Sequence, residues 1–203
     1  MSLLQPVFAC ESVWRSGSVL TFTKLEVRVR FPSPIRHNSV MATEITVAEL
    51  SSDDWARLRD LRLAALADSP AILAGKLDEE RNFTEEQWRE TFKKLSYVVA
   101  TINGQDVAMI NVENLVGDFG ATCWLGGLWS NPKYRGSGAV RAIFNYMDSV
   151  ASKRGWMVQG LGVMESNTSA ISVFEKYGFT KRGDRVESRG KPGNYYFRMI
   201  KSL

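Results

Sequence analysis

The chain has 203 residues, of which 44% are hydrophobic and 24% are charged, and its formal net charge is +4. These fractions are ordinary for a globular domain, and no apolar run reaches the roughly 18 residues that a membrane-spanning helix needs. Two cysteines (Cys10 and Cys123) and one histidine (His37) provide neither a disulfide framework nor a metal-binding pattern. The composition therefore excludes a membrane span, a disulfide scaffold and a His-rich zinc site, and it favours a reducing, cytoplasmic setting.

Most of the positive charge lies in the first 40 residues. They contain five Lys or Arg and two Glu, a net charge of +3, which leaves +1 for residues 41–203. Because the rest of the chain is almost neutral, the net charge gives no support to nucleic-acid binding.

Residues 1–40 show no sustained helical or strand period, whereas a clear strand pattern begins just after Met41. Residues 29–32, Val-Arg-Phe-Pro, can be back-translated as GTT-CGA-TTC-CC, the generic T-arm sequence of a tRNA gene. We therefore expect residues 1–40 to be a mis-called reading frame, with translation starting at Met41, or a disordered extension. The Arg and Ser content also suits an organelle transit peptide, so this alternative stays open.

From residue 41 onward, strand and helix periods follow one another without a linker or an internal repeat. Ser51–Asp54 has the residues of a helix start, Thr84-x-x-Gln87 is a capping box, and Asn103-Gly104 predicts a hairpin turn. We expect strands at 45–50, 97–102, 107–115, 123–130, 157–163, 179–182 and 194–200, and helices at 55–68, 84–94, 139–154 and 167–177.

The most informative segment is the turn between the 123–130 strand and the helix that follows it. Here Arg135-Gly136-Ser137-Gly138 places two glycines directly before a helix. Glycine allows a tight turn, and the first N–H groups of a helix have no partner within it and lie where the dipole favours anions. The segment therefore predicts a site for a pyrophosphate, although two glycines before a helix also occur in plain tight turns. Its spacing matches neither the P-loop nor the dinucleotide fingerprint.

A second segment, residues 165–179, restricts the interpretation. Ser166 or Asn167 can cap a short helix, and Gly178 stands where a left-handed C-terminal cap is expected. Together the two segments resemble the GNAT N-acetyltransferase superfamily. Arg135 and Gly138 match its acetyl-CoA signature, Arg/Gln-x-x-Gly-x-Gly/Ala. Its Asn-x-x-Ala-x-x-x-Tyr-x-x-x-Gly-Phe segment is matched by Asn167, Ala170, Gly178 and Phe179.

The resemblance implies an α/β fold of the α+β type: one GNAT domain over residues 41–203, with a mixed central sheet of six to seven strands flanked by about four helices. It also implies acetyl-CoA as the co-substrate, without a metal. In this family the strand before the signature splays from its neighbour and binds the pantetheine arm, and the turn binds the phosphates. The cofactor-binding residues implied are Leu128, Trp129, Ser130, Arg135, Gly136, Ser137, Gly138, Ala139, Val140, Asn167 and Phe174.

The chain departs from the family pattern at two positions. Val140 replaces the last Gly or Ala of the signature, which keeps the N–H group but adds bulk near the phosphates. Phe174 stands where many members have the Tyr that protonates the leaving thiolate. Tyr177, one turn further along, is a candidate acid, or it packs beneath Gly178. Glu165, at the exit of the 157–163 strand, is a candidate base, or it is a solvent-facing carboxylate.

We therefore expect an acetyl-CoA-dependent N-acetyltransferase that acts on a primary amine of a small molecule or protein, as a monomer or homodimer. Neither nucleic acid nor a membrane is an expected partner. The acidic stretch at Glu79, Glu80, Glu85 and Glu86 would suit a cationic amine, or it is a solvated helix face. Because Phe174 has no proton to give, the alternative is a CoA-binding regulatory or interaction protein with lost or weak catalysis.

Overall fold

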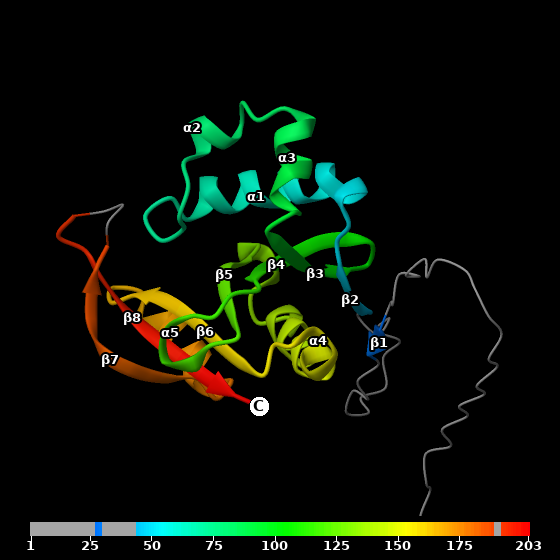
Figure 1. The fold of residues 1–203 in the computed structure, drawn as a ribbon. Coiled ribbons are helices and arrows are strands. Elements are labelled where there is room, and N and C mark those ends of the chain that lie inside the picture. Colours follow the sequence, from blue (N-terminus) through cyan, green and yellow to red (C-terminus); the bar gives the residue numbers. More distant parts are fainter. Residues whose placement is uncertain (1–26, 30–43, 189–191) are drawn as a thin grey trace, which may run out of the picture.

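One mixed sheet runs through the part of the chain that the computed structural model describes, which is residues 27–29, 44–188 and 192–203 (Figure 1). Its eight strands lie in the order β1-β2-β3-β4-β5-β6-β8-β7. Only β5 and β6 pair in parallel among these strands, and every other neighbouring pair is antiparallel. The strands are β1 (Val27–Val29), β2 (Ile45–Glu49), β3 (Leu95–Ile102), β4 (Gln105–Glu113), β5 (Cys123–Ser130), β6 (Val158–Met164), β7 (Thr180–Glu187) and β8 (Tyr195–Ser202).

The helices cover both faces of this sheet (Figure 1). They are α1 (Trp55–Asp68), α2 (Leu77–Glu80), α3 (Glu85–Thr91), α4 (Ala139–Arg154) and α5 (Thr168–Lys176), with three short 3-10 turns at Ser52–Asp54, Asp118–Gly120 and Pro132–Tyr134. One hydrophobic cluster joins α1 and α3 to one face, and a larger cluster joins α4 and α5 to the other. The expected mixed α/β domain is confirmed, with seven strands, β2 to β8, within residues 44–203.

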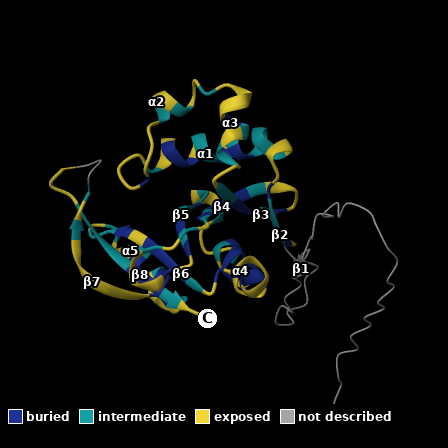
Figure 2. Ribbon diagram, viewed as in Figure 1, coloured by how far each residue is buried: buried dark blue, intermediate teal, exposed yellow. Residues whose placement is uncertain are grey.

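Helix α4 shows why the predicted helices form where they do. Ala139, Ile143, Met147 and Val150 recur at helical spacing, and all four are buried against the sheet. Figure 2 shows this buried face of α4 beside exposed residues on its other side. Gly155, with φ of +74°, ends the helix in the left-handed conformation that glycine adopts at little cost.

Most predicted elements begin and end within two residues of the observed ones, but two of them differ by more. Helix α3 begins with the predicted capping box, in which the Thr84 N–H donates to Gln87 and the Gln87 N–H to Thr84, but it ends at Thr91 rather than Lys94. Strand β7 extends to Glu187, five residues beyond the predicted end. It is an almost wholly exposed edge strand, so no alternation of apolar and polar residues marks its length.

Strand β1 lies within the segment that we expect to be a mis-called frame or a disordered extension. Its three residues pair antiparallel with β2, with Val27 opposite Val47. Residues 1–26 and 30–43 lie outside the described residues, so the origin of this segment stays a prediction.

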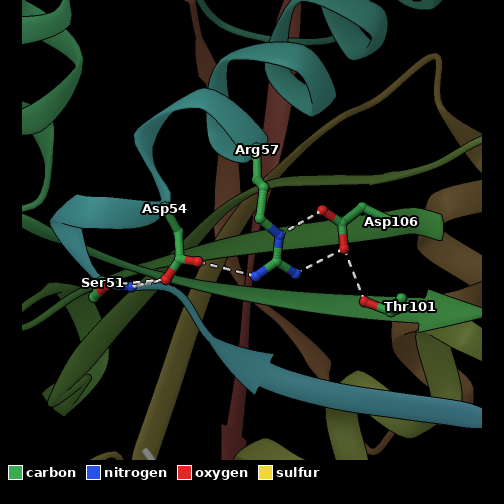
Figure 3. A network of polar contacts seen from close by, with 5 residues as sticks. All are labelled: Ser51, Asp54, Arg57, Thr101 and Asp106. Atoms are coloured by element: carbon green, nitrogen blue, oxygen red, sulfur yellow. Dashed lines mark hydrogen bonds and ion pairs between the residues drawn. The ribbon is translucent and has the colours of Figure 1, made fainter. Parts of the chain in front are cut away.

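The first turn of α1 is fixed to the β3–β4 hairpin by a polar network (Figure 3). Arg57 donates from Nε and Nη2 to the two carboxylate oxygens of Asp106, at 2.9 and 2.8 Å, and from Nη1 to Asp54 at 3.1 Å. Thr101 donates to the same Asp106 at 2.8 Å. The hydrogen bond to Asp106 raises the pKa of Arg57 above its usual range, so the guanidinium stays charged. This anchor fixes the start of α1, whose later residues reach β5.

Candidate functional site

The C-terminal half of β5 separates from β6. The two strands pair only over Cys123–Leu125 and Gln159–Leu161 in the described chain, whereas β5 continues to pair with β4 as far as Ser130. Leu128, Trp129 and Ser130, the predicted pantetheine-binding residues, lie in this diverging half. Its edge toward β6 is therefore free of strand pairing, as the resemblance implied.

A β-bulge lies in the same half of β5. Met109 of β4 is opposite Trp129, but Asn111 is opposite Gly126, so one β4 residue faces two residues of β5. Gly127, one of those two, has φ of +59°, in the left-handed region. Such a bulge interrupts the ladder and increases the local twist. It turns the backbone of Leu128 and Trp129 relative to the first half of the strand.

The turn from Arg135 to Val140 presents free backbone donors at the start of α4. Both glycines are left-handed, with φ of +79° at Gly136 and +96° at Gly138. The N–H groups of Gly136, Gly138, Val140 and Arg141 have no acceptor within the part of the chain that the structure describes. No atom lies within 4 Å of the position that a Cβ would take on Gly136. Four amides at a helix N-terminus, beside open space, fit the pyrophosphate of acetyl-CoA.

Two residues of the same turn use their N–H groups inside the protein. Ser137 donates to the Tyr134 carbonyl at 3.1 Å, and Ala139 lies 3.4 Å from the Ser137 hydroxyl oxygen. These bonds shape the turn, so the N–H groups left to bind an anion are the other four. The branched side chain of Val140 leaves that residue's N–H group free.

Arg135 is paired with the last residue of α1, although more than half of its side chain is exposed. Its Nη2 donates to Asp68 Oδ2 at 2.7 Å and its Nε to the Ser130 carbonyl at 3.3 Å. Asp68 Oδ2 also accepts from the Trp129 indole at 2.9 Å and from Ser69 at 2.8 Å. These hydrogen bonds, led by that of Trp129, lower the pKa of Asp68. Asp68 thus joins both predicted cofactor segments to α1, a contact that no sequence motif indicates.

Asn167 lies at the same edge of the sheet, because α5 begins just after β6 ends. Its side-chain oxygen caps α5 by accepting from the Ala170 N–H at 3.2 Å, as predicted, and from Ser169 at 3.1 Å. This cap fixes the orientation of the helix start beside the diverging strands. The contact of Asn167 with the cofactor stays a prediction.

Phe174 and Tyr177 belong to an aromatic cluster between α4 and α5. Phe174 is 7% exposed and packs edge-on against Phe144 and Phe179, at centroid distances of 6.4 and 5.8 Å. The Tyr177 ring stacks on Phe144, with the ring centroids 4.3 Å apart. Tyr177 thus packs on α4, and its role as an acid stays a prediction.

Glu165 is ion-paired. It follows β6, where its N–H donates to the Tyr195 carbonyl at 2.9 Å, and its carboxylate accepts from Arg185 at 3.0 Å. Arg185 in turn lies over the Tyr195 ring, 4.3 Å from its centroid. Glu165 lies at the predicted edge, but an amine reaching it must compete with Arg185.

The acidic stretch around α2 and α3 is largely neutralised by internal pairs. Glu80 forms a two-bond pair with Arg62, at 2.7 and 2.8 Å, and both side chains are less than a fifth exposed. The more exposed carboxylates of Glu79 and Glu85 pair with Lys76 and Arg89. An unbroken acidic wall for a cationic amine is therefore not present in this part of the chain.

One groove lies away from the predicted donor-site residues. Its volume is about 800 Å³, and it is open between α3 and the β2–β3 edge, at the other end of the sheet from Ser130. Its carboxylates include Glu49 and Glu90, which pair with Arg154 and Lys93. It is also lined by Glu85 and Glu86 of the acidic stretch, but by none of the predicted catalytic or cofactor-binding residues, so the predicted donor site depends on the strand divergence and the turn.

Across residues 44–188 and 192–203, no group of three or more His, Cys, Asp or Glu could hold a metal ion. No helix in the same described segments is long and apolar enough to cross a membrane.

Comparison with solved structures places this fold among acetyltransferases. A GNAT acetyltransferase from Streptococcus pneumoniae has a TM-score of 0.64 at 16% identity, covering 79% of this chain and 100% of that chain. A ribosomal-protein-S5-alanine acetyltransferase from Vibrio fischeri has a TM-score of 0.64 at 14% identity, over 87% and 96%. RimL, a ribosomal L7/L12 α-N-protein acetyltransferase in complex with coenzyme A, has a TM-score of 0.62 at 10% identity, over 78% and 94%.

Sequence comparison gives the family. No curated protein sequence matches the chain. The family model described as "Acetyltransferase (GNAT) family" matches residues 55–179, which is more than half of the chain and includes both the diverging strand and the α4 turn. The chain belongs to the GNAT acetyltransferase family.

Proposed function

We propose that this protein is an acetyl-CoA-dependent N-acetyltransferase that moves an acetyl group directly to a primary amine of a small molecule or protein. One observation carries the proposal: the unpaired half of β5 and the free amides of the α4 turn meet at one edge of the sheet. The unpaired half of β5 suits the pantetheine arm of acetyl-CoA, and the free amides of the turn suit its pyrophosphate. The similarity of the fold to a CoA-bound acetyltransferase supports the same assignment.

The chain itself would supply orientation and backbone charge stabilisation. Acetyl-CoA supplies the thioester carbonyl and a thiol leaving group. N–H groups of the turned β5 backbone, around Leu128 and Trp129, would donate to the carbonyl oxygen as it gains charge. The bulge and the Asp68–Trp129 hydrogen bond hold that backbone in place, which provides the proximity part of the rate enhancement. The amine nitrogen bonds to the acetyl carbon as the C–S bond breaks, the thiolate leaves with the electron pair, and the amine loses a proton.

We assign that proton to Glu165 and the protonation of the thiolate to Tyr177, as candidate base and acid. Glu165 lies at the end of β6, and release from Arg185 would free its carboxylate. Loss of a general base or acid costs about 100-fold or more in rate. Each role therefore predicts that Glu165→Gln or Tyr177→Phe lowers kcat by this factor. If a variant keeps its kcat, the replaced residue does not transfer the proton, and water transfers it instead.

A thiol-release assay over an amine panel tests the function. We expect acetyl-CoA turnover by the wild type and its loss in Gly136→Glu, because the added carboxylate would enter the open space beside the free amides. Gly155→Glu is the matched control: it has a similar φ of +74°, is also open, and lies at the other end of α4. Equal turnover in the two variants would contradict the phosphate site.

A second function, a CoA-binding regulatory or interaction protein without catalysis, is favoured by Phe174. This residue replaces the proton-donating Tyr of the family, and its ring lies in the core against Phe144. The two functions differ in one outcome. Binding of acetyl-CoA with no turnover on any amine would support the regulatory function and refute the enzyme.

A further inference from the structure

Two polar side chains flank the β5 bulge on the face covered by α1, and the proposed transfer uses neither. They are Asn111 of β4 and Arg62 of α1. A Cβ placed on Gly127 would lie 2.7 Å from Asn111 Nδ2 and 3.8 Å from Arg62 Nη1. The two nitrogens are therefore at most 6.5 Å apart, which is the sum of these distances.

Both nitrogens are donors without an acceptor in the part of the chain that the structure describes. Arg62 uses Nε and Nη2 for Glu80 and for the Ala74 carbonyl, which leaves Nη1 unused. The Asn111 amide makes no hydrogen bond to a described residue. The buried side-chain atoms without a hydrogen-bond partner do not include these two nitrogens. Since both lack a partner, they are not buried, and solvent reaches them. They form a ready site for an oxygen atom beside the acetyl-binding strand.

The charge balance decides which oxygen fits. The two-bond pair with Glu80 neutralises Arg62, so a carboxylate placed at Nη1 would also face the Glu80 charge. A neutral carbonyl oxygen has no such penalty, and its two lone pairs accept from two donors. The oxygen of the same amide, Asn111 Oδ1, lies 2.7 Å from the position that a Cβ would take on Gly126. There Oδ1 can accept a hydrogen bond from an amine N–H.

Gly126 and Gly127 leave the space beside the Asn111 amide open. A Cβ on Gly126 or Gly127 would come within 2.7 Å of the Asn111 amide and displace it. The donor and acceptor atoms of the Asn111 amide, side by side above these glycines, suit an extended backbone with an amine next to a carbonyl. An alkyl amine or a lysine side chain has no carbonyl at that separation.

We propose that Asn111 and Arg62 form an acceptor subsite that binds the N-terminal amine and first carbonyl of a polypeptide. This rests on the proposed function. The amine would donate to Asn111 Oδ1, and the carbonyl would accept from Asn111 Nδ2 and Arg62 Nη1. The subsite makes the protein selective for α-amines that are followed by a peptide bond, over ε-amines and free amino acids.

Competition within one peptide tests this. The substrate is a set of peptides, X-Ala-Ala-Lys-Ala-Ala-amide, with each residue type at X, and tandem mass spectrometry gives the ratio of α- to ε-acetylation. Comparing this ratio between variants cancels the different pKa values of the two amines and any change in acetyl-CoA affinity. We expect α-acetylation to predominate for the wild type, and Asn111→Leu to lower the ratio by about 10-fold, the effect of one or two hydrogen bonds.

Two further variants complete the design. Arg62→Lys removes the planar fork but keeps the charge beside Glu80, and we expect it to lower the ratio as well. Glu113→Leu, two residues from Asn111 on the same face of β4, is the control that keeps the ratio. Circular dichroism checks that each variant is folded.

The outcomes separate the two proposals. Equal acetylation of both amines, or a ratio unchanged by Asn111→Leu and Arg62→Lys, would overturn the subsite and leave the transferase standing. Turnover on alkyl amines but not on any peptide would do the same. No turnover on any amine would refute the transferase, and the subsite would fall with it. Faster acetylation of free alanine than of alaninamide would overturn the preference for a neutral carbonyl.

Discussion

Removing the carboxylate of Asp68 should destabilise the protein chiefly through Trp129. Asp68 Oδ2 accepts from the indole of Trp129, the guanidinium of Arg135 and the hydroxyl of Ser69. The Arg135 side chain is 56% exposed and can turn to water, so losing that partner costs little. Trp129 is only 6% exposed, so its N–H would stay unpaired in the interior.

The magnitude follows from these exposures. An unpaired buried donor costs about 1–3 kcal/mol, and a partly exposed ion pair adds about 0–1 kcal/mol. We therefore expect Asp68→Ala to lower the free energy of unfolding by about 2 kcal/mol, which is a Tm decrease of about 4–8 °C for a domain of this size. Asp68→Asn keeps an oxygen acceptor for the indole, so its cost should be less than half as large.

Thermal unfolding followed by circular dichroism measures both variants, and Trp129→Phe supplies the second arm of a double-mutant cycle. In the Trp129→Phe background no indole N–H remains, so Asp68→Ala should cost less than about 1 kcal/mol. Equal Tm values for Asp68→Ala and Asp68→Asn would refute the reasoning. So would an undiminished cost of Asp68→Ala in the Trp129→Phe background.

Three other predictions concern single side chains. The folded pKa of Asp68 lies below its ordinary value of 3.8, so its carboxylate stabilises the protein above that pH, and this is lost as the pH falls through the folded pKa. The Tm difference between wild type and Asp68→Asn should accordingly narrow below about pH 4, and a constant difference would argue against it. Gln159 is fully buried, and neither atom of its amide bonds to a described residue. Gln159→Met should therefore raise the free energy of unfolding by about 1–2 kcal/mol, seen as a higher urea midpoint. A lower midpoint would show that the amide is satisfied. Burial raises the pKa of Cys123 to about 12. Iodoacetamide at pH 8 should therefore label this thiol only when urea unfolds the protein, as peptide mapping would show. Labelling in the folded protein would contradict its burial.

Local features of the structure could be predicted because their causes lie within a few residues. The Thr84–Gln87 capping box, the Asn167 cap and the left-handed Gly155 each depend on hydrogen bonds or backbone angles of one turn. The buried stripe of α4 follows from helical periodicity in the same way. The turn before α4 belongs to this group, since helix geometry alone leaves its first N–H groups free.

Contacts between distant segments could not be predicted. Asp68 meets Trp129 and Arg135 only because the Arg57 network and the packing of α1 place the end of that helix over β5. Nothing in the residues around Asp68 indicates this contact. The bulge at Gly127 likewise depends on the register of β4 and β5.

The ion pairs of the acidic stretch could not be predicted either. As a sequence, Glu79, Glu80, Glu85 and Glu86 suggest one negative surface. In the fold the first three each pair with a cation, and that of Glu80 comes from α1, 18 residues earlier in the chain. These ion pairs remove most of the negative surface that the sequence suggests, and they depend on the tertiary structure.

If the amides of the α4 turn bind the pyrophosphate of acetyl-CoA, their chemical environment must change when acetyl-CoA is added. Titration of ¹⁵N-labelled protein with acetyl-CoA, followed by amide NMR shifts, measures this change residue by residue. The largest shifts should occur at Gly136, Gly138, Val140 and Arg141, with further shifts along Leu128–Ser130. Shifts that leave the turn unchanged and gather instead at the groove between α3 and β3, or no shifts at millimolar acetyl-CoA, would contradict this binding.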